Sequence, residues 1–111
     1  MKKDVELSRR EELVLSILWV IEESGNKASC SEVIEKLRDD YGLDYAATTV
    51  YTFLTNLAKK GYAGVERKGI NYYFSLCSRD EYTEQVLRRI NKVFFNGNKK
   101  KFVAKIKSID M

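Results

Sequence analysis

The segment ATTVYTFLTNLAKKGY, residues 47–62, places short hydroxyl side chains and ammonium groups on one side of an expected helix. At 100° per residue, these polar side chains lie opposite the apolar ones. The outward set, which begins just before the segment, is Tyr45, Thr48, Thr52, Thr55 and Lys59, with Thr49 and Asn56 on its flank. A threonine hydroxyl can hydrogen-bond phosphate oxygens or base edges, and its methyl can pack on a thymine methyl. The spacing therefore predicts a helix face suited to the major groove of DNA.

The same face has a structural explanation, which is a surface helix that happens to be rich in threonine. Threonine is a mediocre helix former, and a surface with no other role would more readily use Ala, Glu, Lys or Gln. Short side chains would also let the helix axis approach base edges closely. The threonine content therefore favours recognition over a purely structural role.

Basic residues follow this helix in two places. One pair closes the helix, and the other lies in YAGVERKGINYYFSL, where β-branched and aromatic residues surround Lys68-Gly69 and predict a hairpin. The expected phosphate contacts are Lys59, Lys60, Arg67 and Lys68, with Arg9 or Arg10 as a further backbone contact. Such contacts would supply most of the affinity for DNA, and the threonine face would supply the choice of sequence.

The net charge of +4 and the pI of about 9.0 also favour a polyanionic partner. The excess of positive charge is concentrated at the C-terminus, where Asp110 is the only acidic residue from Arg88 onward. A solvated helical face explains these cations as well as a binding role does.

The elements that would position these residues are bounded by local signals. Capping boxes at residues 8–11, 29–32 and 78–81 predict three helix starts. The first helix should stop near Ser24, the second should end at a left-handed Gly42, and Asp44 is the expected cap of the threonine-rich helix. This order predicts a mainly α (α+β) fold, a winged helix-turn-helix with a small β-hairpin wing over residues 1–77.

Residues 78–111 are predicted to form a helical dimerisation tail. Two apolar stripes lie in this tail at helical spacing, on either side of a break at residues 96–98. They consist of Tyr82, Val86, Ile90 and Val93, and of Phe102, Ile106 and Ile109. A partner subunit would bury both stripes at once, whereas a tail folded over its own domain would give a monomer.

Catalytic groups are scarce in this sequence. It contains no histidine, its two cysteines are isolated, and it lacks a phosphate-binding glycine loop and a nucleophile elbow. We therefore expect neither an enzyme nor a site for a metal or other cofactor. No apolar run approaches the roughly 18 to 20 residues that cross a bilayer, and the N-terminus turns acidic early, so we expect a cytoplasmic protein without membrane association.

Three segments match a known pattern: LSRREELVLSILW at 7–19, TTVYTFLTNLAKKGY at 48–62 and RKGINYYFS at 67–75. Through them the chain resembles the penicillinase-repressor family of bacterial transcription regulators, with Glu11 and Trp19 at that family's usual positions. The resemblance implies a homodimeric repressor that binds a palindromic operator in double-stranded DNA. A winged helix that binds only proteins is the alternative, and it would need an apolar or acidic recognition face, which this sequence does not have.

The sequence departs from the family pattern at three places. It lacks the cysteine-rich C-terminal motif of copper-responsive relatives, which disfavours direct metal sensing. Lys105-Ile106 stands where antibiotic-responsive relatives have a cleavable Asn-Phe bond, which argues against induction by a sensor-protease. Asn56 replaces a usual arginine, and it either contacts adenine or lies on the flank against a neighbouring helix.

Overall fold

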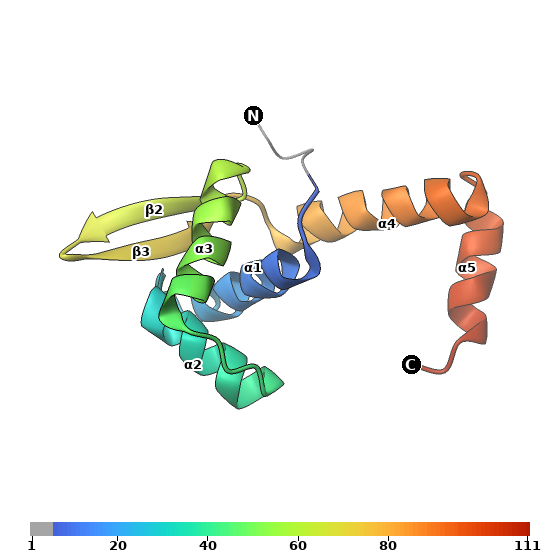
Figure 1. The fold of residues 1–111 in the computed structure, drawn as a ribbon. Helices are drawn as coiled ribbons and strands as arrows, with labels where there is room; N and C mark the ends of the chain where they lie inside the picture. Colours follow the sequence, from blue (N-terminus) through green and yellow to red (C-terminus); the bar gives the residue numbers. More distant parts are fainter. Residues whose placement is uncertain (1–5) are drawn as a thin grey trace. The chain divides into compact units, whose positions relative to one another are not determined.

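The computed structural model describes residues 6–111 and contains helices and one antiparallel sheet (Figure 1). The order is α1 (Arg9–Glu22), β1 (Ala28–Ser29), α2 (Cys30–Tyr41), α3 (Ala47–Lys59), β2 (Ala63–Lys68), β3 (Ile70–Ser75), α4 (Arg79–Phe95) and α5 (Lys99–Ser108). This confirms the predicted mainly helical α+β class and the winged-helix order of elements. The chain divides into two compact units, residues 1–78 and 79–111. The predicted boundary lies one residue before this division.

The first two helices begin as their sequences predict. The Ser8 side chain accepts a hydrogen bond from the Glu11 amide, and the Glu11 carboxylate accepts one from the Ser8 amide. Ser29 and Glu32 form the same reciprocal box at the start of α2. This helix ends at Gly42, whose φ of 65° is left-handed. Each box satisfies backbone amides that a helix start would otherwise leave unpaired.

The start of α3 differs from its prediction, because the cap is Ala46 and not Asp44. Ala46 makes no side-chain cap bond, and its carbonyl accepts hydrogen bonds from the Thr49 and Val50 amides. The chain between Gly42 and Ala46 is not helical, which puts Asp44 two residues too early to cap the helix. The prediction that Asp44 caps α3 is therefore wrong, because a capping residue must directly precede the first helical residue.

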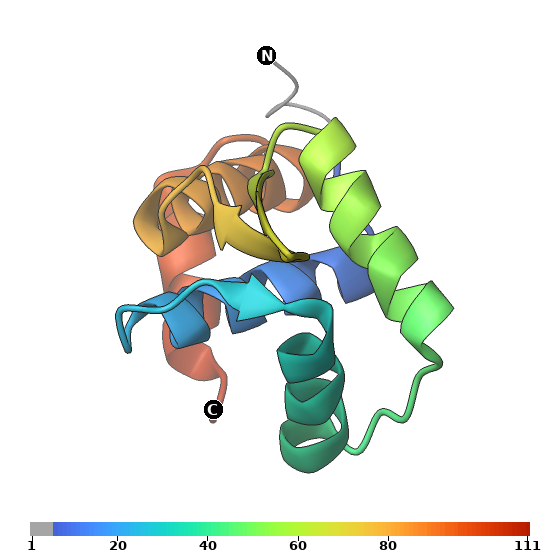
Figure 2. The same ribbon diagram turned by 90° about the vertical axis from the view of Figure 1, so that its left-hand side faces the viewer.

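The core of the first unit forms where α3 packs against both α1 and α2 (Figure 2). The apolar side of α3 that the sequence predicts is the buried one, since Val50, Leu54 and Leu57 are each 0% exposed. Leu18 of α1 and Val33 of α2 are equally buried. Burying these aliphatic side chains fixes which side of α3 faces solvent.

The sheet has the order β1-β3-β2, and both neighbouring pairs are antiparallel. β2 and β3 form the predicted hairpin, with Lys68 opposite Ile70 and Gly69 between them at a φ of 79°. β1 was not predicted and pairs Ala28 with Tyr73 and Ser29 with Tyr72. It joins the wing to the segment between α1 and α2.

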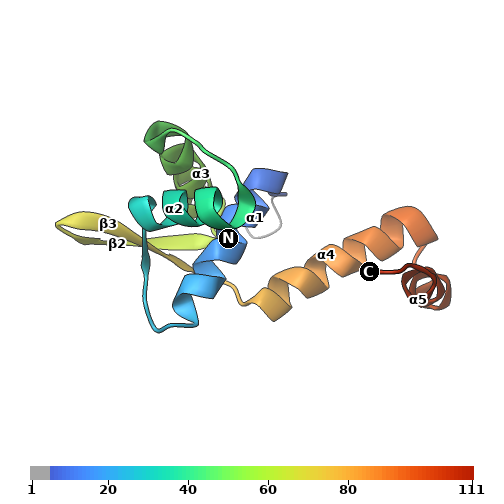
Figure 3. The ribbon, with the colours of Figure 1, turned by 90° about the horizontal axis from the view of Figure 1, so that it is seen from below.

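The second unit consists of α4 and α5, joined at Asn96-Gly97 (Figure 3). Both joint residues have positive φ, 51° and 76°, and the Asn98 side chain caps α5 by accepting from the Lys101 amide. The Phe95 and Phe102 rings stack across the joint with centroids 5.2 Å apart. This packing holds the two helices in one compact unit.

The residues predicted for dimerisation differ in exposure. Tyr82 is buried, whereas Val86, Ile90 and Phe102 are half-buried. Val93, Ile106 and Ile109 are exposed at 63%, 37% and 49%. Within residues 6–111, no helix is both long and apolar enough to span a membrane.

Candidate nucleic-acid interface

The polar side of α3 faces solvent in the order that its helical spacing predicts. Thr48, Thr52 and Lys59 are exposed, and Thr49 and Thr55 are half-buried. The Thr52 hydroxyl donates to the Thr48 backbone carbonyl at 2.9 Å, as a threonine in a helix can do to the carbonyl four residues before it. With its proton directed at the backbone, this oxygen offers lone pairs outward together with the threonine methyl. At Thr52 the face therefore presents an acceptor and a methyl group, and its exposed cation is Lys59.

Tyr51 belongs to the same exposed surface, although the sequence analysis did not include it. Its side chain is 51% exposed and lines a shallow cavity of about 280 Å³ between α2, α3 and β3. Ser31, Ile70 and Asn71 also line this cavity. Tyr51 lies 60° from Thr48 on the helical wheel, so its spacing indicates a place on the outward face of α3. An aromatic residue is more often expected in a core, which is why it was not predicted there.

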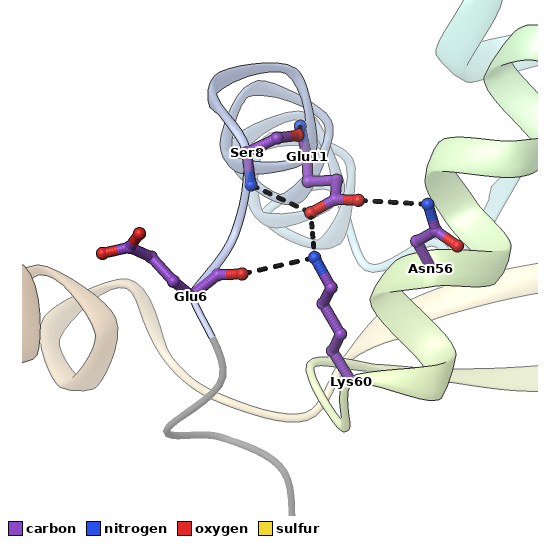
Figure 4. Close-up of polar contacts among 5 residues, drawn as sticks. All are labelled: Glu6, Ser8, Glu11, Asn56 and Lys60. Carbon is purple, nitrogen blue, oxygen red and sulfur yellow. Dashed lines mark hydrogen bonds and ion pairs between the residues drawn. The ribbon is translucent and has the colours of Figure 1, made fainter.

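A buried carboxylate joins the start of α1 to the C-terminal half of α3 (Figure 4). Glu11 is 4% exposed, and its Oε1 lies 2.7 Å from the Lys60 Nζ. Its Oε2 accepts from the Asn56 amide at 3.2 Å. Lys60 also donates to the Glu6 carbonyl at 3.2 Å, so one ammonium group ties together two segments of the N-terminal region. We call Glu11, Asn56 and Lys60 the Glu11 junction.

Two opposing effects act on the Glu11 carboxyl. Burial alone would raise its pKa, because a charged form is poorly solvated there. The hydrogen bond from Lys60, the Ser8 amide, the Lys60 charge and the Asn56 amide together outweigh burial and lower the pKa below its ordinary value. Glu11 is thus held as a carboxylate that can accept from all its partners.

The Glu11 junction decides between the two interpretations of Asn56. Its amide is directed to the neighbouring helix, as the structural alternative proposes. The Lys60 ammonium is likewise directed inward to Glu11 and not to the exposed face of α3, where a phosphate contact would need it. Both residues hold α3 in place, and Lys59 is the exposed cation at this end of the helix.

Arg10 makes a second connection between α1 and the recognition region. Its Nε donates to the Tyr45 hydroxyl, and the Tyr45 ring meets the Phe53 ring edge-on at 5.5 Å. Tyr45 was expected on the outward face of the helix, but it precedes α3 and is half-buried. Arg9 and Arg10 are both exposed, but only Arg10 uses its Nε in this contact.

The wing carries its predicted cations at the tip of the hairpin. Arg67 and Lys68 are both exposed. Glu66 beside them lies between Lys68, at 3.5 Å, and Lys27, at 2.5 Å. Lys27 and Lys68 both lower the Glu66 pKa, the hydrogen bond from Lys27 most of all. Glu66 thus neutralises part of the local charge, which leaves Arg67 as the cation of the tip that forms no ion pair with a described residue.

The cysteines and acidic residues form no metal site within residues 6–111. Cys30 and Cys77 are not joined in a disulfide, and Cys77 is buried. Burial raises the pKa of the Cys30 thiol, which keeps it protonated and weakly nucleophilic.

The comparisons with known proteins agree with this geometry. The family model described as "Penicillinase repressor" matches residues 7–109, nearly the whole chain. A solved structure described as "The complex structure of hsRosR-S4", a winged-helix regulator, has a TM-score of 0.58 and 16% sequence identity. That alignment covers 96% of this chain and 90% of that one, and at this identity it supports the fold alone. Among curated proteins, no sequence matches. The chain therefore belongs to the penicillinase repressor family of DNA-binding transcription regulators.

Proposed function

We propose that this protein is a transcriptional repressor that binds a palindromic operator as a homodimer, with α3 in the major groove. The observation that carries the proposal is the two-sided character of α3. Its apolar side buries Val50, Leu54 and Leu57 completely, and its exposed side carries hydroxyls and a cation but no carboxylate. In a family of transcription regulators, a helix with these two sides is best explained as the one that enters DNA.

Base contacts are assigned to the exposed and half-buried threonines of α3. These residues are Thr48, Thr49, Thr52 and Thr55. The outward lone pairs of Thr52 suit an amino group of adenine or cytosine, and its methyl suits thymine. Such contacts discriminate between bases by their donor and acceptor pattern.

Phosphate contacts are assigned to Lys59 at the end of α3 and to Arg67 and Lys68 of the wing. All three side chains are exposed. Contacts of this kind are independent of sequence and weaken as salt concentration rises. Asn56 and Lys60 would act indirectly, by holding α3 at a fixed angle through the Glu11 junction.

Association of two chains is assigned to the second unit. Its exposed apolar side chains include Val93 at 63% and Phe94 at 74%, beside Leu87, Ile106 and Ile109. A two-fold dimer would remove this apolar surface from water on both subunits. It would also match a palindrome whose half-sites lie about 34 to 36 Å apart, or a multiple of that spacing.

The proposal is tested by selecting duplexes from a random pool with the purified full-length chain. We expect enrichment of one sequence with two-fold symmetry, because a dimer presents two identical recognition helices. Anisotropy titrations should then give an affinity for this duplex roughly 10³-fold or more above that for a scrambled duplex of the same composition. A selected pool without symmetry would contradict the dimer, and a pool without enrichment would contradict sequence-specific binding.

A further inference from the structure

The two units of the chain differ in net charge, and the net positive charge lies in the tail and not in the unit that carries α3. Residues 1–78 contain 11 Lys and Arg against 12 Asp and Glu, which gives −1. Residues 79–111 contain nine Lys and Arg against four Asp and Glu, which gives +5. The unit that carries the recognition helix is therefore slightly acidic, and the whole positive excess of the protein lies in the tail.

Much of this excess lies on α5. The lysines of this helix are Lys99, Lys100, Lys101, Lys105 and Lys107. All five are exposed, and none forms an ion pair with any described residue. At 100° per residue, Lys100, Lys101 and Lys107 cover the side of α5 opposite Phe102 and Ile106, Lys105 lies at the flank of that side, and Lys99 lies at the edge of the apolar side. We call this side, with Lys100, Lys101, Lys105 and Lys107, the α5 lysine face.

Helix stability does not account for this arrangement. Lys99, Lys100 and Lys101 occupy the first turn of α5, where the helix dipole disfavours cations and favours carboxylates. Lys101 and Lys105 are four residues apart, and like charges at this spacing repel. Only Lys105 and Lys107 lie in the last turn, where a cation is favourable. The face thus concentrates charge at the expense of the helix that carries it.

The apolar side of α5 argues against a lipid surface as the partner. An amphipathic helix binds a membrane by inserting its apolar side chains. Phe102 is stacked on Phe95 of α4 and is only half-exposed, so this side is partly occupied within the unit. The exposed ammonium groups, which form no ion pair with a described residue, are suited to phosphates in water.

We propose that the α5 lysine face is a second DNA-binding surface, which contacts backbone phosphates without reading sequence. The inference rests on the proposed function, because it assigns to the tail a share of the affinity for the same duplex. Each lysine that neutralises a phosphate releases a counterion and steepens the salt dependence of binding. The tail then supplies charge that the first unit lacks, while α3 supplies the choice of bases.

The test compares two charge-matched pairs of substitutions in the full-length chain, with a random-sequence duplex as the probe. Lys101→Gln with Lys105→Gln removes two charges from the lysine face, and glutamine keeps helix propensity. Lys36→Gln with Arg38→Gln removes two charges from α2, where Asp40 and Asp39 already pair them. Anisotropy titrations at several salt concentrations give the slope of log affinity against log salt. Sedimentation of both variants confirms that neither changes the oligomeric state.

We expect the α5 pair to lower the slope by about 2 and the affinity at 0.1 M salt by roughly tenfold or more. The α2 pair should leave the slope nearly unchanged. Equal losses for both pairs would show an effect of net charge alone and overturn the inference, as would an unchanged slope for the α5 pair. The inference would also be overturned if the unmodified chain bound vesicles of anionic phospholipid, and the α5 pair of substitutions abolished this binding without altering DNA binding. If the unmodified chain binds no duplex, both the proposed function and this inference are refuted. If the unmodified chain binds DNA but the two double substitutions lose affinity equally, only this inference is refuted.

Discussion

The two units of the chain use apolar residues in opposite ways. In the first unit, every helix buries part of its apolar side, and α1 alone buries Val14, Leu15, Ile17, Leu18 and Ile21. In the second unit, Tyr82 is the one buried residue of α4, and α5 has none. Yet Val93 and Phe94 are more exposed than any large apolar residue that the structure describes before them. The first unit therefore has a buried core, and the second leaves apolar surface exposed, as the proposed association of two tails requires.

This comparison predicts the largest effect for a charge placed on the exposed apolar surface of the tail. Val93→Asp should prevent two tails from associating, because a carboxylate would have to be buried without a partner. We expect a monomer at tens of micromolar by sedimentation equilibrium, and a loss of roughly 100-fold in affinity for the symmetric duplex, which is about 2.7 kcal/mol. Circular dichroism should show an unchanged first unit.

The matched control for Val93→Asp is Val20→Asp, since Val20 is an exposed valine of α1 in the first unit. It should leave the oligomeric state unaltered. If the unmodified chain is itself monomeric at these concentrations, or if a chain truncated after Ser78 still dimerises, the assignment of association to the tail is wrong.

A smaller effect is expected at Thr52 of the first unit, to which the proposed function assigns a base contact. Thr52→Ala should weaken binding to the selected operator by about 1 to 3 kcal/mol and leave random DNA nearly unaffected. Thr52→Val keeps a methyl and removes the oxygen, whereas Thr52→Ser does the reverse, so the two variants separate methyl packing from hydrogen bonding. The measurement is an anisotropy titration on both duplexes.

Lys68→Ala is the control for the threonine variants, because a phosphate contact carries no sequence information. It should weaken operator and random DNA alike and lower the salt slope by about 1. Equal losses on both duplexes for Thr52→Ala would remove this residue from base readout.

The smallest effect concerns the Glu11 junction and its dependence on pH. The pKa of Glu11 is lowered in the folded protein, so its contribution to stability is present above the ordinary value of 4.5 and is lost as pH falls through the folded pKa. The unfolding free energy of Glu11→Gln should therefore fall less between pH 6 and pH 3 than that of the unmodified chain. We expect a difference of about 1 kcal/mol or less, because the Lys60 side chain is partly exposed to solvent, which screens the ion pair. Urea unfolding at each pH measures this difference.

Glu35→Gln is the control for the pH experiment, since it removes one exposed carboxylate of α2 that has no ion-pair partner among the described residues. An equal flattening in this variant would show that the Glu11 junction contributes nothing specific to the acid sensitivity of the fold.

Local signals explain which parts of this structure could be predicted from the sequence. The two capping boxes each join residues three apart, and the hairpin turn at Gly69 depends on its immediate neighbours. The buried side of α3 follows from spacing within one helix. Asp44 was a wrong cap because the exact first residue of a helix depends on how the preceding chain enters it.

Contacts between distant residues could not be predicted in the same way. Asn56 and Lys60 lie 45 and 49 residues from Glu11, so nothing in their own segment indicates that they face inward. On a helical wheel Asn56 is a flank position, and both interpretations of it were equally consistent with the spacing. β1 has only two residues and exists through its pairing with β3. Tertiary packing decided all of these features.

Neighbouring residues of α1 hold α3 at both ends. Arg10 binds Tyr45 just before the helix begins, and Glu11 binds Asn56 and Lys60 where it finishes. Because α3 is attached at two points, its orientation within the first unit is set by α1. In the proposed complex, this orientation would not depend on the side chains that touch DNA. The exposed threonines can then be exchanged one at a time without moving the helix. Under the proposed function, α1 would set the orientation of α3, and the exposed threonines would set the operator preference. Substituting these threonines would then change the DNA sequence that the protein recognises, which makes the protein a practical scaffold for reprogrammed DNA recognition.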